Sequence, residues 1–309
     1  MRVALPPSNY VMKMFRNLKY FLPSFNQSLL IVLLLIVAGG LGMGILLAVC
    51  YGAAGVAMAD INPLVMYLCQ FVPPLIYILY KGADTVKENG RLMEKGLFDR
   101  IVKPVPFNTF NFGKVSPAVA FLLVILATFA LMIVLEPLNS LVPMPDSVKQ
   151  IYANMLSNML WTSLSVAVAA PLVEEFFLRG TIMRGMLQHS TPLKAILWSA
   201  FYFALIHMNL YQALGAFIMG LFIGWIYYRS GTLWLAILIH FVNNGSSVLF
   251  TLLNPQMDVE TTLMDIIIQS WSVEAYIGIY TASLAILAAI IFYFYKNLGN
   301  GQSKETISA

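Results

Sequence analysis

The sequence predicts an all-α membrane protein, a bundle of about eight transmembrane helices with both termini in the cytoplasm. Of its 309 residues, 60% are hydrophobic and only 10% are charged, and the mean hydropathy is +0.79. Soluble domains carry about 25% charged residues, so this composition excludes a water-soluble fold. Apolar runs near the roughly 20 residues that cross a bilayer recur along the chain.

Eight of these runs are predicted to span the membrane. The first should also direct the chain to the membrane, because no cleavage site of a signal peptide precedes Ser28. The fourth and fifth are the least regular, since an acidic motif follows one and His207 ends the other. The predicted spans are 28–51, 62–80, 116–135, 155–173, 192–208, 211–228, 232–253 and 275–295.

The distribution of positive charge predicts the orientation. With eight spans, Lys149 is alone on one side of the membrane, and the other Lys and Arg of the 18 lie on the opposite side. Cytoplasmic loops are enriched in Lys and Arg, so both termini are expected in the cytoplasm. The same bias explains the net charge of +4, and no nucleic-acid partner is expected.

The predicted organisation has three parts: an N-terminal membrane scaffold (1–154), a core that holds the polar motifs (155–253), and an outer loop, final span and cytoplasmic tail (254–309). In the scaffold, the charged connection 81–115 is expected to form a short amphipathic helix at the membrane surface. Glycines at GxxxG spacing, such as the pairs beginning at Gly40 and Gly220, predict close helix contacts.

The acidic motif Glu174-Glu175 with Arg179 lies at the end of an apolar run. Carboxylates next to hydrocarbon are costly, which makes the pair a functional-site hypothesis. On a helix, Glu175 and Arg179 are four apart and can pair, whereas Glu174 points about 100° away. Glu174 is therefore the acid expected to face a cavity. Anchoring of a helix end at the membrane surface would also explain the pair.

Two further polar breaks interrupt apolar helices. His207 follows Phe203 by four residues, and His240 precedes Asn244 by four, so each pair shares a helical face. A packing role for His207, and interhelical hydrogen bonding for His240 and Asn244, are the structural alternatives. Depths counted along the predicted spans allow Glu174, His207 and His240 to converge in a cavity open to the cytoplasm.

A carboxylate, two imidazoles and a carboxamide suit hydrolysis by activated water, because they supply a general base and donors for an oxyanion. A zinc site on Glu174, His207 and His240 is an alternative, although no HExxH motif occurs. Cys50 and Cys69 form no CxxC pair, which argues against a cysteine-bound metal. No cofactor is therefore expected, and a divalent metal stays an alternative.

The three motifs resemble, in their order and membrane context, those of the CPBP intramembrane protease family, which contains the type II CAAX prenyl endopeptidases and bacterial proteins linked to bacteriocin processing and immunity. The resemblance covers roughly residues 155–253. The matching positions are Glu174-Glu175-x-x-x-Arg179, Phe203-x-x-x-His207 and His240-x-x-x-Asn244.

This resemblance implies an intramembrane endopeptidase that cleaves membrane-associated or lipidated, CAAX-like substrates. It further implies Glu174 as the base for water, assisted by His207, with His240 and Asn244 as oxyanion donors and Glu175, Arg179 and Phe203 as supporting residues. A bacterial plasma membrane is the expected location. A non-proteolytic immunity or scaffold protein and a small transporter are the alternative functions, the latter because transporters also carry intramembrane acids.

Overall fold

The computed structural model describes residues 7–56, 61–146, 148–149, 158–254, 256–258, 260–299 and 301, among which there is no β-strand. Its elements are α1 (Pro7–Asn17), η1 (Leu18–Tyr20), α2 (Phe25–Leu33), η2 (Leu34–Met43), α3 (Gly44–Ala53), α4 (Pro63–Gln70), α5 (Val72–Glu94), η4 (Phe98–Arg100), α6 (Pro117–Asn139), α8 (Met159–Ser163), η5 (Leu164–Ala169), α9 (Ala170–Glu175), η6 (Phe176–Met183), α10 (Arg184–His189), α11 (Pro192–Leu205), α12 (Leu210–Ser230), α13 (Leu233–Leu253), α14 (Leu263–Ser270) and α15 (Val273–Asn297).

Six helices in the described part of the chain are long and apolar enough to cross a membrane. The prediction of an all-α, multi-pass membrane protein is thus confirmed, whereas the count of eight spans and the orientation are not. The six are Phe25–Ala53, Pro63–Glu94, Pro117–Leu138, Leu210–Ser230, Leu233–Leu253 and Val273–Asn297.

The other two predicted spans form helices of different extent. The run 192–208 gives the 14-residue α11, which ends at Leu205 and is shorter than the roughly 20 residues of a full span. The run 155–173 opens a helix that continues without a break from Met159 to His189. Residues 155–157 and the predicted boundary at residue 154 lie outside the described residues.

Prolines and capping side chains explain where many of the helices begin. Proline occupies the first turn of α4, α6 and α11, where its missing N–H costs no hydrogen bond. Gly231, with φ of 62°, ends α12 in a left-handed turn. The N-cap side chains that accept a backbone N–H are Asn62, Ser116, Thr191, Asn209, Thr232, Thr262 and Ser272.

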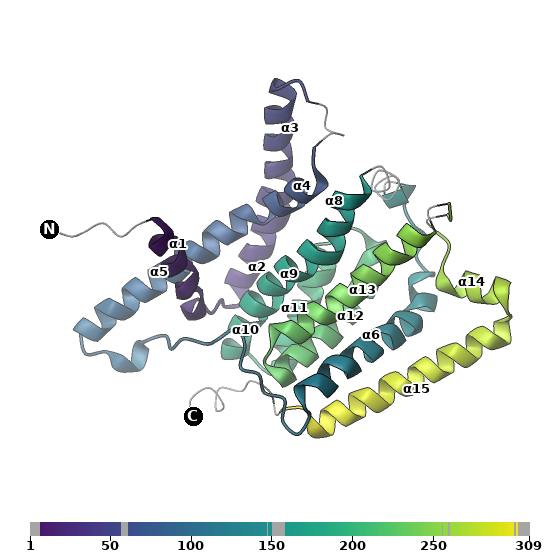
Figure 1. Cartoon of the computed structure of the whole chain (residues 1–309). Helices are drawn as coiled ribbons and strands as arrows, with labels where there is room; N and C mark the ends of the chain where they lie inside the picture. The colour runs from purple at the N-terminus through teal and green to yellow at the C-terminus, as the bar shows by residue number, and fades with distance from the viewer. Residues whose placement is uncertain are drawn as a thin grey trace.

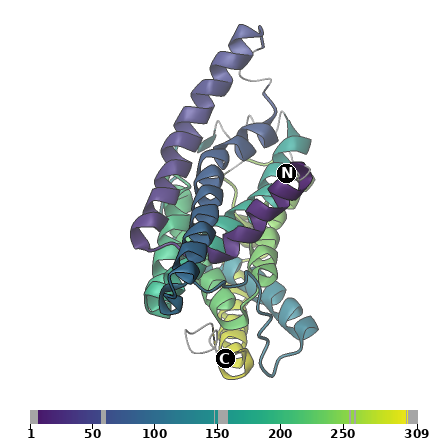
Figure 2. The same ribbon diagram turned by 90° about the vertical axis from the view of Figure 1, so that its left-hand side faces the viewer.

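In Figure 1, α8, α9 and α10 follow one line through the molecule, and α13, α6 and α15 lie beside this line in that order. Contacts join α9 to α13, α13 to α6, and α6 to α15, while α11 packs against α12. The helix formed by α2, η2 and α3 rises beyond the others (Figures 1 and 2). The acidic motif therefore lies at the centre of the bundle.

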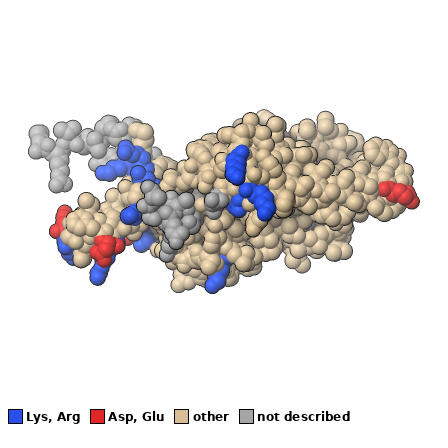
Figure 3. Space-filling model, turned by 90° about the horizontal axis from the view of Figure 1, so that it is seen from below, with Lys and Arg blue, Asp and Glu red and all other residues tan. Residues whose placement is uncertain are grey.

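Segments predicted to face the cytoplasm meet at one end of the bundle. Arg184 donates to the carbonyls of Leu18, Phe21 and Val105, and Arg229 donates to the carbonyls at the end of α15. In the view from below (Figure 3), the visible Lys and Arg side chains lie over the left and central parts of the molecule. The segments that the sequence places on one side of the membrane thus lie at the same end of the bundle. That this end faces the cytoplasm stays a prediction.

Two local expectations are wrong. The charged residues after position 80 form no separate amphipathic helix, because α5 continues through them to Glu94. Gly40 and Gly44 make no close helix contact, since a Cβ on Gly44 would meet nothing within 4 Å. At Gly220 the expectation is confirmed, because an added Cβ would lie 3.0 Å from the Cα of Ala200 on α11.

Candidate active site

The acidic motif lies midway along the continuous helix from Met159 to His189. Glu174 and Glu175 end the α-helical segment α9, between the π-helical segments η5 and η6. π-helical turns are rare and frequently occur at functional sites. Glu174 is 8% exposed and Glu175 is fully buried. The apolar bundle thus encloses both carboxylates.

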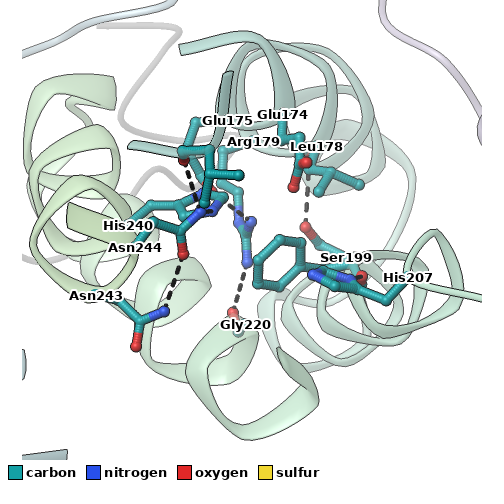
Figure 4. A network of polar contacts seen from close by, with 12 residues as sticks. Glu174, Glu175, Leu178, Arg179, Ser199, His207, Gly220, His240, Asn243 and Asn244 are labelled. Carbon is teal, nitrogen blue, oxygen red and sulfur yellow. Dashed lines mark hydrogen bonds and ion pairs between the residues drawn. The ribbon is translucent and has the colours of Figure 1, made fainter. Parts of the chain in front are cut away.

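Glu175 forms the centre of a buried ion-pair network. Its Oε1 lies 3.0 Å from Nη1 of Arg179 and 2.9 Å from Nδ1 of His240. Arg179 also donates from Nη2 to the carbonyl of Gly220, at 2.8 Å. Figure 4 shows these groups meeting between the helices. The predicted pairing of Glu175 with Arg179 is confirmed, and the guanidinium is held by a second helix through a glycine carbonyl.

Asn244 continues this network from His240. Its Nδ2 lies 3.0 Å from the carbonyl of Val166 and 3.2 Å from Nε2 of His240, and its Oδ1 accepts from Asn243 at 3.0 Å. Because a carboxylate and a carboxamide N–H flank the His240 ring, the network assigns the proton of the neutral ring to Nδ1 and the lone pair to Nε2. The predicted pair of His240 and Asn244 therefore meets at one point, as expected.

His207 lies in the turn after α11 and not within a span. Its Nδ1 is 2.7 Å from the carbonyl of Phe203, and since a carbonyl only accepts, Nδ1 donates and Nε2 holds the lone pair. Met208, with φ of 56°, adopts a left-handed conformation, which is uncommon outside glycine and often found at functional sites. Asn209 then caps α12. This turn fixes the imidazole at the end of a short helix.

Phe203 separates the two imidazoles. Its ring centroid lies 5.1 Å from that of His207 and 5.2 Å from that of His240, both edge-on. The guanidinium of Arg179 lies 5.0 Å from the same ring, which adds a cation–π attraction. Phe203 thus packs against three polar groups of the site.

Glu174 has a different partner from Glu175. Its Oε1 accepts a hydrogen bond of 2.8 Å from the hydroxyl of Tyr67 on α4, and its Oε2 is buried with no hydrogen-bond partner in the described part of the chain. Among those residues, neither imidazole is hydrogen-bonded to Glu174. His240, expected beside Glu174, instead contacts Glu175. Sequence reasoning missed Tyr67, because no pattern distinguishes it from the other 14 tyrosines.

A cavity of about 200 Å³ adjoins Glu174. Besides Glu174, its polar lining consists of Tyr67 and Gln70, and the remaining lining is mainly apolar, with Leu35, Phe71 and Ile206 among its side chains. The cavity connects Glu174 with η2, α4 and the turn that carries His207. Glu174 therefore faces a cavity, as the sequence predicted for this acid.

The side chains do not fit a metal centre. Across the described residues, no three His, Cys, Asp or Glu side chains lie together as a ligand group. His240 already donates from Nδ1 to Glu175 and accepts at Nε2 from Nδ2 of Asn244. Neither ring nitrogen is therefore turned toward Glu174 or His207.

The six long apolar helices of the described part of the chain define an integral, multi-pass membrane protein, and a polar network is buried within it. Residues 156–246 match the family model described as type II CAAX prenyl endopeptidase Rce1-like. This match includes the acidic motif and both histidine motifs, and it confirms the resemblance to that protease family over this segment. No curated protein and no solved structure matches the chain significantly.

Proposed function

We propose that the protein is an intramembrane endopeptidase that hydrolyses peptide bonds of membrane-associated or lipidated substrates, with Glu174 as the general base. The observation that carries this proposal is the environment of Glu174, a nearly buried carboxylate beside a cavity, with one oxygen held by Tyr67 and the other without a hydrogen-bond partner among the described residues. The Rce1-like match over residues 156–246 supports the reaction class.

In the proposed reaction, Oε2 of Glu174 removes a proton from water while the water oxygen forms a bond to the scissile carbonyl carbon. The tetrahedral intermediate then collapses, the C–N bond breaks, and the proton passes from Glu174 to the leaving amine. The products are a carboxylate terminus and an amine terminus. His207, whose neutral ring has its lone pair at Nε2, would accept a hydrogen bond from the second O–H of the same water, and this proton is released when the new carboxylic acid ionises to the carboxylate.

The proposed oxyanion donors are Asn244 and His240, and the two differ in what they require. Asn244 can donate from Nδ2 once one of its present acceptors is released. His240 can donate from Nε2 only when its ring is doubly protonated, a charge that Glu175 at 2.9 Å would stabilise. The buried Glu175–Arg179 pair therefore supports the site electrostatically without contacting substrate.

We further propose that the site opens to the cytoplasm and that the protein resides in a bacterial plasma membrane. The predicted cytoplasmic ends of the helices, gathered around Arg184 and Arg229, support this orientation through the positive-inside rule. Cysteine labelling from each side at Lys87 and Asp258, which the predicted topology places on opposite sides, tests it. Labelling of both positions from one side contradicts the arrangement.

Cleavage of a fluorogenic prenylated peptide by purified protein tests the function. Glu174→Gln keeps the size of the side chain and an acceptor for Tyr67 but removes the base, and we expect a loss of about 10²- to 10⁴-fold in kcat. Glu136→Gln is the matched control, because this half-buried glutamate of α6 accepts from the backbone N–H of Met264 on α14, and α14 lies well away from α9 in Figure 1. It should retain wild-type activity.

The same assay separates the alternatives. Wild-type activity in Glu174→Gln would show that the base is wrong, and reversible loss of activity with a chelator would show that the metal-free reaction is wrong. Absence of cleavage by the wild-type protein on prenylated, acylated and unmodified apolar peptides alike would contradict the protease function itself and favour a scaffold or transporter.

A further inference from the structure

Tyr67 is the one side chain hydrogen-bonded to Glu174 among the residues that the structure describes. It lies on α4, 107 residues before Glu174 in the sequence and outside the segment 156–246 that matches the protease family. The proposed base is therefore held from the N-terminal scaffold and not from the core that carries the motifs.

The backbone around Tyr67 is firmly placed. Asn62 caps the start of α4 by accepting the backbone N–H groups of Leu64 and Val65. At the other end, Gly39 of η2 touches the carbonyl of Gln70 so closely that any Cβ there would overlap it. A helix of only 8 residues that is fixed at both ends gives the hydroxyl of Tyr67 little freedom to leave its position.

The ring of Tyr67 is also linked to the helix of Glu174 by aromatic contacts. Its centroid lies 5.3 Å from that of Phe71, and Phe71 lies 5.3 Å from Phe177. Phe177 is three residues after Glu174 on the same helix. Aromatic pairs at these distances are favourable, so this chain of rings gives α4 and the acidic helix a second link beside the hydrogen bond.

The hydrogen bond divides the two oxygens of Glu174 between two roles. Oε1 accepts the Tyr67 hydroxyl at 2.8 Å, whereas Oε2 is left without a partner in the part of the chain that is described. Both side chains line the same cavity. With Oε1 fixed, rotation of the carboxylate is restrained, and one defined oxygen remains to receive a proton.

We propose that Tyr67 is a positioning residue for this site, a scaffold hydroxyl that holds Oε1 of Glu174 so that Oε2 meets the attacking water. This inference rests on the proposed function. It also makes the N-terminal scaffold a part of the catalytic apparatus, since the core segment alone would leave the base without its hydrogen-bond donor.

Steady-state kinetics of Tyr67→Phe test this role. The variant keeps the ring and the cavity wall but removes the hydroxyl, so we expect kcat to fall about 10- to 100-fold while KM changes by less than about two-fold. The control is Tyr77→Phe, a half-buried tyrosine of α5 that packs edge-on against Phe21 and should leave both constants at the wild-type level. A kcat of Tyr67→Phe equal to that of the wild type overturns the proposal.

A melting cycle tests the bond independently of activity. Tyr67→Phe should lower the melting midpoint by about 3 °C in the wild-type background and by less than about 1 °C in Glu174→Ala, where the acceptor is already absent. Equal shifts of the melting midpoint in both backgrounds would show that the Tyr67 hydroxyl contributes nothing through Glu174, and this would overturn the proposed hydrogen bond.

The two assays also separate the two proposals. If Glu174→Gln is inactive and Tyr67→Phe is fully active, the protease function stands and the positioning role is wrong. If the wild type cleaves no peptide, the protease function fails, and the positioning role fails with it.

Discussion

Replacement of Arg179 by methionine should show how strongly the buried charge network depends on its single arginine. Arg179 and Glu175 have no exposed side-chain surface, and their ion-pair distance is 3.0 Å. Removal of one member of such a pair leaves a buried charge without compensation and costs about 3–5 kcal/mol. At about 2 °C per kcal/mol for a chain of this size, the melting midpoint of Arg179→Met should fall by about 6–10 °C.

The double variant Glu175→Gln/Arg179→Met separates the unpaired charge from the lost packing. With both charges removed, Gln still accepts from Nδ1 of His240, and neither position of the former pair carries an unpaired charge. We therefore expect the double variant to regain at least about half of the lost stability. Arg179→Lys should fall between wild type and Arg179→Met, because a lysine keeps the charge but not the bidentate reach to Glu175 and the carbonyl of Gly220.

The assay is intrinsic fluorescence of the detergent-purified protein during heating at one fixed scan rate. Arg91→Met serves as the control, since Arg91 pairs with Glu88 on the surface with more than half of each side chain exposed, and such pairs contribute at most about 1 kcal/mol. A double variant that melts no higher than Arg179→Met would refute the argument, because the loss would then come from packing and not from the unpaired carboxylate.

Three further predictions concern other parts of the fold. Arg184→Lys should lower the melting midpoint by about 6 °C, because the buried guanidinium donates to five backbone carbonyls, among them those of Phe21 and Val105, and a lysine has three donors; an unchanged midpoint contradicts this. Gly220→Ala should destabilise by about 1–3 kcal/mol, since its Cβ would press on α11, whereas Gly44→Ala, with open space around it, should be neutral or slightly stabilising; equal midpoints refute the contrast. In ¹⁵N spectra of the neutral rings, His207 and His240 should both carry the proton on Nδ1, with His189→Gln used for assignment; a signal for protonated Nε2 at either ring contradicts the assigned network.

Hydropathy predicted the helical class correctly because apolar runs have few alternatives to membrane helices. It could not fix the extent of each helix. The run 192–208 stays apolar through Ile206, yet α11 stops at Leu205 because Asn209 caps the next helix and Met208 turns the backbone with positive φ. The end of this helix depends on turn geometry, which periodicity does not report.

Local geometry likewise predicted one half of the site. The pairing of Glu175 with Arg179 follows from a spacing of four on one helix, and the structure confirms it. The partner of Glu174 could not be found in this way, because the Tyr67 contact joins segments 107 residues apart. Depth along a span is uncertain by a turn, so it could not decide which of two adjacent carboxylates His240 would meet.

The division between the adjacent glutamates follows from helix geometry. Neighbouring residues on a helix point about 100° apart, so the backbone that turns Glu175 toward α12 and α13 turns Glu174 toward α4 and the cavity. The Glu175–Arg179 ion pair is thereby enclosed on one side, and Glu174, the proposed base, faces the cavity on the other. In the proposed reaction a substrate would reach Glu174 through this cavity without displacing the Glu175–Arg179 pair, so one short motif would serve both stability and chemistry.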